Sequence, residues 1–182
     1  MNCYEVIKSY MRAWTLREIT IVGLLLVVIL ALLLMSIRHH RLRKVQALTS
    51  FLLVLYLVMV FAATVFTRES GIRRYKLLPG WSWYAVFSEH NVTLLLQNIL
   101  NGVLLIPVGW LLPFICNHKV VIRSALGLGI LISLVIEICQ LLFMCGLFEW
   151  DDMVHNGIGC MVGGFLGNLV WERISKRDIK LE

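Results

Sequence analysis

The chain has 182 residues, of which 59% are hydrophobic and 15% charged, and its mean hydropathy is +0.83. These values exclude an ordinary soluble domain and predict one membrane domain over residues 1–182. The formal net charge of +6 could suit nucleic acid, but the basic residues stand in blocks between apolar runs. That pattern favours membrane topology and contact with anionic membrane lipids, and no nucleic-acid partner is predicted. The five cysteines show no metal or redox spacing, so neither a metal nor another cofactor is predicted.

Five long apolar stretches are each suited to a helix across the hydrocarbon core, which needs about 20 residues. They cover residues 19–37, 45–67, 92–116, 121–143 and 153–171. The first is too long for the apolar part of a signal peptide, and the basic segment 38–44 after it is a stop-transfer pattern. The predicted fold class is therefore all-α, a polytopic transmembrane helix bundle of about five spans.

The distribution of basic residues predicts the orientation. Ten of the 17 Lys and Arg residues fall in segment 38–44, at Lys119 and Arg123, and in the tail after Trp171. The others, which include Lys8 and Arg12, fall on the opposite side of a five-span protein. Because cytoplasmic loops are enriched in Lys and Arg, we expect a bacterial cytoplasmic-membrane protein with its N-terminus outside and its C-terminus in the cytoplasm.

Glu137 is the only charged residue between Ser124 and Phe148, inside the fourth apolar stretch. A carboxylate at membrane depth costs about 2.5–3.5 kcal/mol, so such residues usually face a polar site in the bundle. With the predicted orientation, polar pairs of the third, fourth and fifth stretches reach a similar depth near the extracytoplasmic face. Glu137 and Asp152 are the candidates for catalysis. Residues of the same region that are expected to bind a ligand are Asn98, Asn101, Gln140, Asp151 and Asn156.

Structural roles compete with this interpretation. Asparagines in a membrane also form hydrogen bonds between helices, and an Asp at the start of the fifth span suits an N-cap. His155, three residues after Asp152, has no second histidine beside it, so a metal site is not predicted.

The segment 68–91 combines basic and aromatic residues between the second and third spans. Such a segment suits the membrane interface, where it would be an ordinary aromatic belt or a cover over the polar site. As a cover it would supply Arg73, Arg74 and Lys76 to an anionic group such as phosphate.

Glycines at every fourth position mark one face of the fifth span, at Gly159, Gly163 and Gly167. Small residues at this period let helices approach closely. We expect packing against another span of the same chain, with Gly127 and Gly129 as a matching surface, and a homo-oligomer through the same glycines is the alternative.

Three motifs occur in a fixed order after Pro79, which follows the run RRYKLL at 73–78. They are QNILNGVLLIPVG at 97–109, EICQ at 137–140 and WDDMVHNGIG at 150–159. In this combination, residues 73–169 resemble the VanZ-like family of small bacterial membrane proteins. The positions that the resemblance carries over are Asn98, Pro107, Gly109, Glu137, Gln140, Asp152, Asn156 and Gly159.

Two departures from the family pattern concern charge. Family members often carry Gly-Arg-x-x-Asp before the acidic loop, where this chain has Cys145-Gly-Leu-Phe-Glu149, and often Asn where it has Lys76. A basic residue of segment 68–76 could replace the missing Arg, but the sequence does not show which one.

The resemblance implies a role in low-level resistance to teicoplanin and related lipoglycopeptides, and no established catalytic activity. The expected partner is a lipid-linked cell-wall precursor or the lipoglycopeptide itself, in addition to membrane lipids. Two alternatives remain: an intramembrane enzyme that modifies a lipid-linked substrate by Glu/Asp acid-base chemistry, and a membrane scaffold.

Overall fold

The structure is a computed structural model that describes residues 13–178, with side chains through residue 176. Of the basic residues used to predict the orientation, Lys8, Arg12 and Lys180 lie outside the described residues. Within them, five helical segments are long and apolar enough to cross a membrane, which confirms the predicted all-α bundle. They are α2 (Leu16–Arg38), α3 (Lys44–Phe61) with its π-helical continuation η1 (Ala62–Phe66), α5 (Val92–Leu104) followed by α6 (Ile106–Cys116), α7 (Ile122–Phe143) and α8 (Trp150–Asp178).

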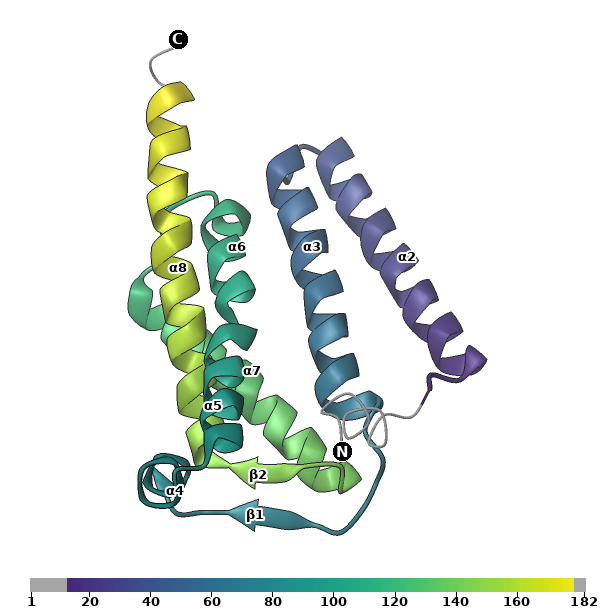
Figure 1. Cartoon of the computed structure of the whole chain (residues 1–182). Helices are drawn as coiled ribbons and strands as arrows, with labels where there is room; N and C mark the ends of the chain where they lie inside the picture. Colours follow the sequence, from purple (N-terminus) through teal and green to yellow (C-terminus); the bar gives the residue numbers. More distant parts are fainter. Residues whose placement is uncertain (1–12, 179–182) are drawn as a thin grey trace.

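Three short elements complete the fold at one end of the bundle (Figure 1). They are the strand β1 (Arg74–Lys76), the helix α4 (Trp81–Glu89) and the strand β2 (Leu147–Glu149). The strands pair in parallel, which the sequence did not predict because three-residue strands carry no readable periodicity. The helix α4 follows Pro79 and Gly80, and Gly80 has a left-handed backbone with φ of 78°.

The glycines of α8 pack against α5 and α6, as Figure 1 shows for the neighbouring helices. A Cβ added at Gly159, Gly163 or Gly167 would overlap the carbonyl oxygen of Gly102, Ile106 or Trp110, in that order. The predicted packing within the chain is therefore confirmed, and the same glycine face is already covered. The predicted matching surface was wrong in part: Gly129 of α7 meets α8 at Gly157, but Gly127 faces open space.

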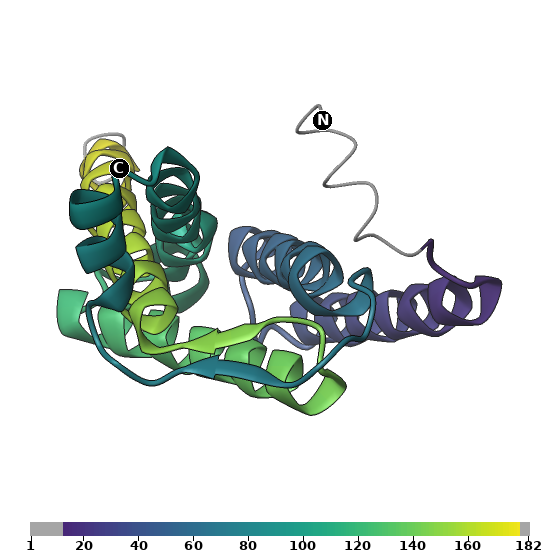
Figure 2. The same ribbon diagram turned by 60° about the horizontal axis from the view of Figure 1, so that its bottom comes forward.

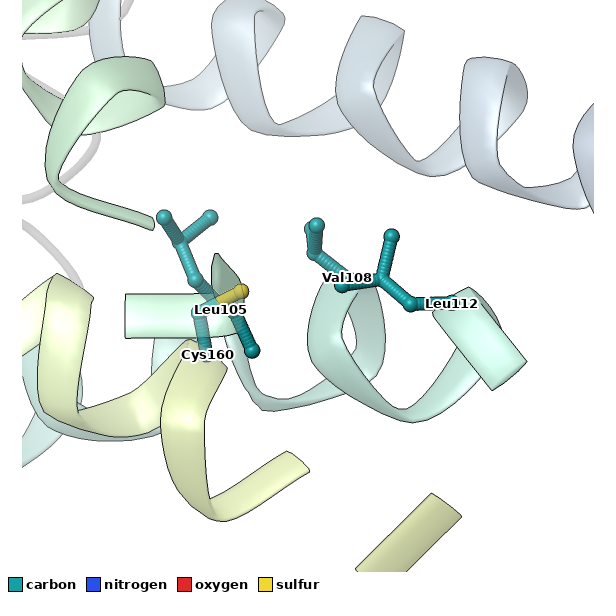
Figure 3. Close-up of a cluster of buried hydrophobic side chains, with 5 residues drawn as sticks. Leu105, Val108, Leu112 and Cys160 are labelled. Atoms are coloured by element: carbon teal, nitrogen blue, oxygen red, sulfur yellow. The ribbon is translucent and has the colours of Figure 1, made fainter. Parts of the chain in front are cut away.

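The apolar core lies where α6, α7 and α8 meet (Figure 3). Leu105, Val108 and Cys160 have no exposed surface, and Leu112 and Ala125 complete the cluster. Gly109 of α6 and Gly129 of α7 have no side chain, so both helices approach α8 closely at Cys160, where an added Cβ on either glycine would overlap.

The third span breaks at Leu105, between α5 and α6. Pro107 stands in the first turn of α6 and lacks the N–H that would continue the hydrogen-bond ladder of α5. The Tyr56 hydroxyl donates a hydrogen bond to the Leu104 carbonyl oxygen at 2.7 Å. A carbonyl at the break is thereby paired within the bundle.

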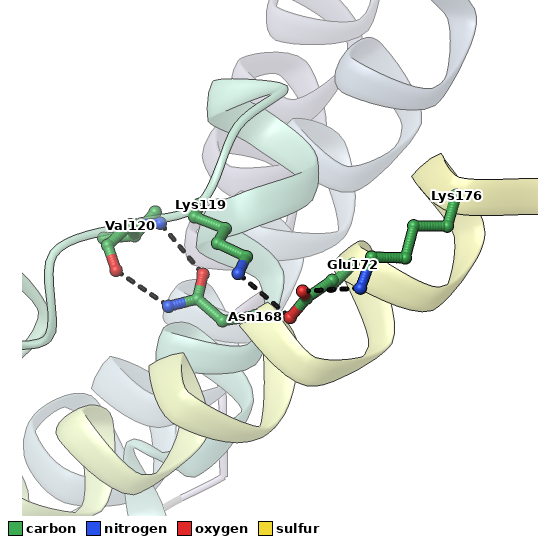
Figure 4. A network of polar contacts seen from close by, with 5 residues as sticks. All are labelled: Lys119, Val120, Asn168, Glu172 and Lys176. Carbon is green, nitrogen blue, oxygen red and sulfur yellow. Dashed lines mark hydrogen bonds and ion pairs between the residues drawn. The ribbon is translucent and has the colours of Figure 1, made fainter. Parts of the chain in front are cut away.

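The far end of α8 is fixed to the connection between α6 and α7 (Figure 4). The Asn168 amide nitrogen donates to the Val120 carbonyl oxygen at 2.8 Å, and its oxygen accepts from the Val120 N–H at 2.9 Å. Glu172 pairs with Lys119 at 2.9 Å and with Lys176 at 3.0 Å.

By contrast, α2 packs mainly on α3 and has no buried residue. Its apolar side chains point outward on all sides, which suits a helix surrounded by lipid.

Candidate functional site

The β1–β2 pair brings two distant segments of the chain together across the end of the bundle (Figure 2). Lys76 lies opposite Glu149 in the strand register. The Gly71 N–H also donates to the Met144 carbonyl oxygen at 2.8 Å, just before β2. Segment 68–91 is thereby held over the start of α8 and the end of α7.

Three carboxylates meet under this segment: Glu137 from α7, Glu149 from β2 and Asp152 from α8. We call these three residues the acidic cluster. Glu137 and Glu149 are each only 2% exposed, and the Glu149 N–H donates to Glu137 Oε2 at 3.0 Å. Asp152 repels both glutamates electrostatically, and the exposed Arg68 attracts Glu137 and Asp152.

Glu149 lies outside the spans and has an aromatic partner from α4. The Trp81 Nε1–H donates to Glu149 Oε2 at 3.1 Å, and Lys76 Nζ lies 4.8 Å from the centroid of the Trp81 ring. Burial, followed by repulsion from Asp152, raises the pKa of Glu149 from 4.5 to about 7. The Trp81 hydrogen bond and the Lys76 charge act in the opposite direction but do not cancel the effect of burial.

Asp151 caps the N-terminus of α4. Its Oδ1 accepts from the Gly80 N–H at 2.6 Å, and its Oδ2 accepts from the Ser82 N–H at 3.0 Å and the Ser82 hydroxyl at 2.6 Å. The Asn98 amide nitrogen of α5 donates to the same hydroxyl oxygen at 3.2 Å. A carboxylate at a helix N-terminus is favourable through hydrogen bonding and the helix dipole. The sequence predicted an N-cap for the fifth span, but the Asp151 carboxylate instead caps α4, a different helix.

A second contact holds α4 to α8. The Trp83 Nε1–H donates to His155 Nε2 at 2.8 Å, and the two rings meet edge to face with centroids 5.6 Å apart. This bond requires an unprotonated Nε2, so the neutral ring of His155 carries its proton on Nδ1.

Four buried polar atoms beside the acidic cluster have no hydrogen-bond partner within the described part of the chain. They are Asn101 Nδ2, Asp152 Oδ1, His155 Nδ1 and Asn156 Oδ1. The Asn101 amide lies close enough to the Asp152 carboxylate for a side-chain hydrogen bond, but Asn101 Nδ2 and Asp152 Oδ1 miss the geometry of a full one. Unpaired buried polar atoms are costly and rare in folded proteins, so four beside one cluster mark a place suited to a polar ligand.

Most of the predicted site residues lie in this region. Asn98 and Asp151 hold α4, Asn101 and Asp152 face each other, and Asn156 Nδ2 donates to the Ser133 hydroxyl of α7 at 2.8 Å. Gln140 instead donates to the Thr64 carbonyl oxygen at 3.0 Å, in the π-helical turn where backbone bonding is irregular.

The basic residues of segment 68–76 divide into two groups. Arg68 and Lys76 interact electrostatically with the acidic cluster. Arg73 and Arg74 are exposed and make no hydrogen bond or ion pair with it among residues 13–176. Within the same range no group of three or more His, Cys, Asp or Glu side chains is placed to hold a metal ion.

Sequence reasoning left several residues of the site out of its list, among them Glu149, Ser82 and Trp83. Glu149 stands in a predicted loop, where a carboxylate is expected to be hydrated. Ser82 has no signal of its own, and Trp83 is typical of an interfacial belt. The pairing of β1 with β2 is what brings all three into the site.

The family model described as VanZ/LLP1 matches residues 50–171. The chain belongs to this family. The match contains the acidic cluster, α4 and both strands, and it excludes α2. No curated protein and no solved structure was found to match. As a VanZ/LLP1 family member with five apolar helices, the chain is a multi-pass membrane protein.

Proposed function

We propose that this protein lowers susceptibility to teicoplanin and related lipoglycopeptides by binding a cell-envelope component at the acidic cluster. Membership of the VanZ/LLP1 family supports the resistance role. The observation that carries the binding role is the burial of Glu137 and Glu149, each 2% exposed, beside Asp152. Carboxylates kept next to one another at the end of a membrane bundle are costly to maintain and are found mainly at functional sites.

The surroundings of the cluster favour a lipid-linked headgroup as the ligand. The four unpaired polar atoms offer hydrogen bonds to sugar or peptide groups. Arg73 and Arg74 on the exposed strand edge supply cations for a phosphate. The exposed rings of Tyr84 and Phe87 on α4 suit the membrane interface, where such a headgroup lies.

The proposal includes the orientation of the chain in the membrane. With the N-terminus outside and the C-terminus in the cytoplasm, the acidic cluster faces the extracytoplasmic side of the bacterial cytoplasmic membrane. Lipoglycopeptides act at this side. The glycine face of α8 plays no part in the proposal, because α5 and α6 cover it.

The test is teicoplanin susceptibility of a sensitive Gram-positive host that expresses the protein at matched membrane levels. The wild-type chain raises tolerance to teicoplanin more than to vancomycin, and Glu137→Gln loses the effect. Glu172→Gln is the matched control, because Glu172 lies at the opposite end of α8 and pairs only with exposed lysines (Figure 4). Equal tolerance with wild type and Glu137→Gln contradicts the proposed site, and no tolerance with wild type contradicts the proposed function.

A second candidate function is acid-base catalysis on the same lipid-linked substrate, and the proximity of Glu137 and Glu149 favours it. A carboxylate that holds its proton near neutral pH can act as a general acid beside a second carboxylate that acts as a base. Purified protein incubated with a lipid-linked wall precursor would then change the mass of that precursor, and Glu137→Gln would not. An unchanged precursor that stays bound favours binding over catalysis.

A further inference from the structure

The connection between α2 and α3 lies at the end of the molecule opposite β1, β2 and α4 (Figure 1). A basic depression is present at this connection. Its volume is about 590 Å³, and its lining includes the cationic side chains of Arg41, Arg43 and Lys44 together with His40. The apolar residues Ile37 and Leu42 form another part of the wall, and no carboxylate lines it.

Hydrogen bonds to a third helix hold the depression in shape. The Arg43 N–H donates to Gln46 Oε1 at 3.0 Å, and Gln46 Nε2 donates to the Ile115 carbonyl oxygen of α6 at 2.9 Å. The Arg43 guanidinium also donates to Asn117 Oδ1 at 3.3 Å, just beyond α6. The connection is therefore attached to the end of α6 at two points, and the position of the Arg43 side chain is partly preorganised.

Among residues 13–176, no acid forms an ion pair with the basic side chains of the depression. The ion pairs at this end join Glu172 to Lys119 and Lys176 (Figure 4), and none involves Arg41, Arg43 or Lys44. A role in topology alone needs positive charge but no depression of fixed shape. Three cations without an ion-pair partner in this range, around one hollow, favour an anion with several oxygen atoms.

We propose that this depression binds the phosphate of an anionic phospholipid, with phosphatidylglycerol as the simplest example. Its place at the ends of two spans is the level of the lipid headgroups. Ile37 and Leu42 provide contact for the glycerol and the first carbons of the acyl chains, which a soluble phosphate does not have. The exposed apolar surface of α2 continues from the depression along the bilayer.

The test is native mass spectrometry of the full chain in detergent, with phosphatidylglycerol and phosphatidylcholine of identical acyl chains. Wild type retains phosphatidylglycerol in preference to phosphatidylcholine. The double variant Arg41→Lys, Arg43→Lys keeps the positive charge that sets topology but loses the guanidinium groups that bind phosphate in bidentate fashion. It retains about threefold to tenfold less phosphatidylglycerol, as expected for the loss of charge-assisted hydrogen bonds.

The control Arg38→Lys, Arg123→Lys makes the same chemical change at exposed residues that do not line the depression, and its lipid retention stays at the wild-type level. A double variant that retains as much phosphatidylglycerol as wild type overturns the proposal. The proposal is also overturned if the wild-type protein shows no preference between the two lipids. This comparison uses the wild-type protein alone, so it does not depend on the folding of a variant. Release of the lipid by an equal concentration of inorganic phosphate would assign the site to a soluble anion and also overturn it.

Discussion

At the residue scale, the site combines buried acidic residues with basic residues from segment 68–76. Its charged positions differ from those expected from the family pattern. The chain lacks the Arg often found before the acidic loop, with Leu147 and Phe148 between Gly146 and Glu149. Lys76 lies opposite Glu149 in the strand register and attracts it. Arg68 attracts Glu137 and Asp152. Arg68 and Lys76 of segment 68–76 thus supply positive charge beside the acidic cluster.

The raised pKa of Glu149 predicts a dependence of stability on pH. Because its pKa rises from 4.5 to about 7 on folding, the folded protein binds this proton more tightly than the unfolded chain. The contribution of Glu149 is full below about pH 4.5 and is lost as the pH rises through about 7. Thermal unfolding in detergent is expected to show a fall in stability over this range, and Glu149→Gln is expected to reduce the fall.

The control for this measurement is Glu89→Gln, because Glu89 is exposed at the end of α4. It is expected to keep the wild-type dependence on pH. A Glu149→Gln variant whose stability falls as steeply as that of wild type would contradict the assignment to Glu149.

Individual residues of the site could be predicted where a polar group interrupts an apolar run. Glu137 and Asn98 stand out for this reason, and both are buried in the structure. Glu149 and Ser82 could not be found in this way, because their burial depends on strand pairing between segments about 70 residues apart. The hydrogen bond from Gln140 to the Thr64 carbonyl oxygen could not be predicted from the sequence either, because it depends on a π-helical turn in another span.

At the scale of elements, α4 is a short helix attached to the bundle through a few side chains. Asp151 binds its first turn, Glu149 accepts from Trp81, and His155 accepts from Trp83. All three acceptors belong to β2 or to the start of α8. The position of α4 over the acidic cluster is thus set by the same short segment that carries Glu149 and Asp152.

Removal of the Asp151 carboxylate is expected to loosen α4 without unfolding the bundle. Asp151→Ala leaves two backbone N–H groups and the Ser82 hydroxyl without their acceptor, a loss of about 1–3 kcal/mol. Hydrogen exchange of residues 81–89 should accelerate, while exchange in α7 stays slow. The control Ser88→Ala, on the same helix, removes a hydroxyl that bonds only within α4. Unchanged exchange in Asp151→Ala would show that the cap does not hold α4.

The helix contacts of α8 predict contrasting effects of two small substitutions. Gly163→Ala places a methyl group against the Ile106 carbonyl and should destabilise the protein by about 1–3 kcal/mol. Gly127→Ala faces open space and should be neutral or slightly stabilising, because Ala favours the helix. The melting temperatures of the two variants are compared by thermal unfolding in detergent. Equal melting temperatures would contradict the close packing of α8 on α6.

The elements themselves were largely predictable because long apolar runs are unambiguous. The predicted stretch 45–67 corresponds to Lys44–Phe66, and 121–143 corresponds to Ile122–Phe143. The helix of the fifth span, α8, continues beyond the predicted residue 171 to Asp178. Its last turns are polar, so the apolar pattern did not include them. The break in the third span at Leu105 could only be suspected from Pro107.

At the scale of the whole molecule, the two ends of the bundle differ in charge and, in our proposals, in function. The end with β1, β2 and α4 carries the acidic cluster, and the opposite end, where α2 connects to α3 (Figure 1), carries the basic depression. The difference in basic residues is the ground for the proposed orientation.

Cysteine labelling in intact cells tests this orientation. In a variant without the native cysteines, Arg73→Cys is expected to react with a membrane-impermeant maleimide, because the proposed orientation places Arg73, just before β1, outside. Arg41→Cys is expected to stay protected until the membrane is opened. Both positions are exposed in the structure, so burial does not account for protection at either. The opposite labelling pattern would contradict the orientation.

The central claim is that an envelope component binds at the acidic cluster beneath α4, and photo-cross-linking tests it most directly. A photoreactive amino acid at Phe87, which is 72% exposed on α4, is activated in cells whose lipid-linked wall precursors carry radiolabelled N-acetylglucosamine. The same group at Val28, which is 54% exposed on α2, serves as the control for random contact. We predict labelled adducts at position 87 that are lost with Glu137→Gln and absent at position 28. Equal labelling at both positions, or labelling at 87 that Glu137→Gln leaves unchanged, would contradict the account.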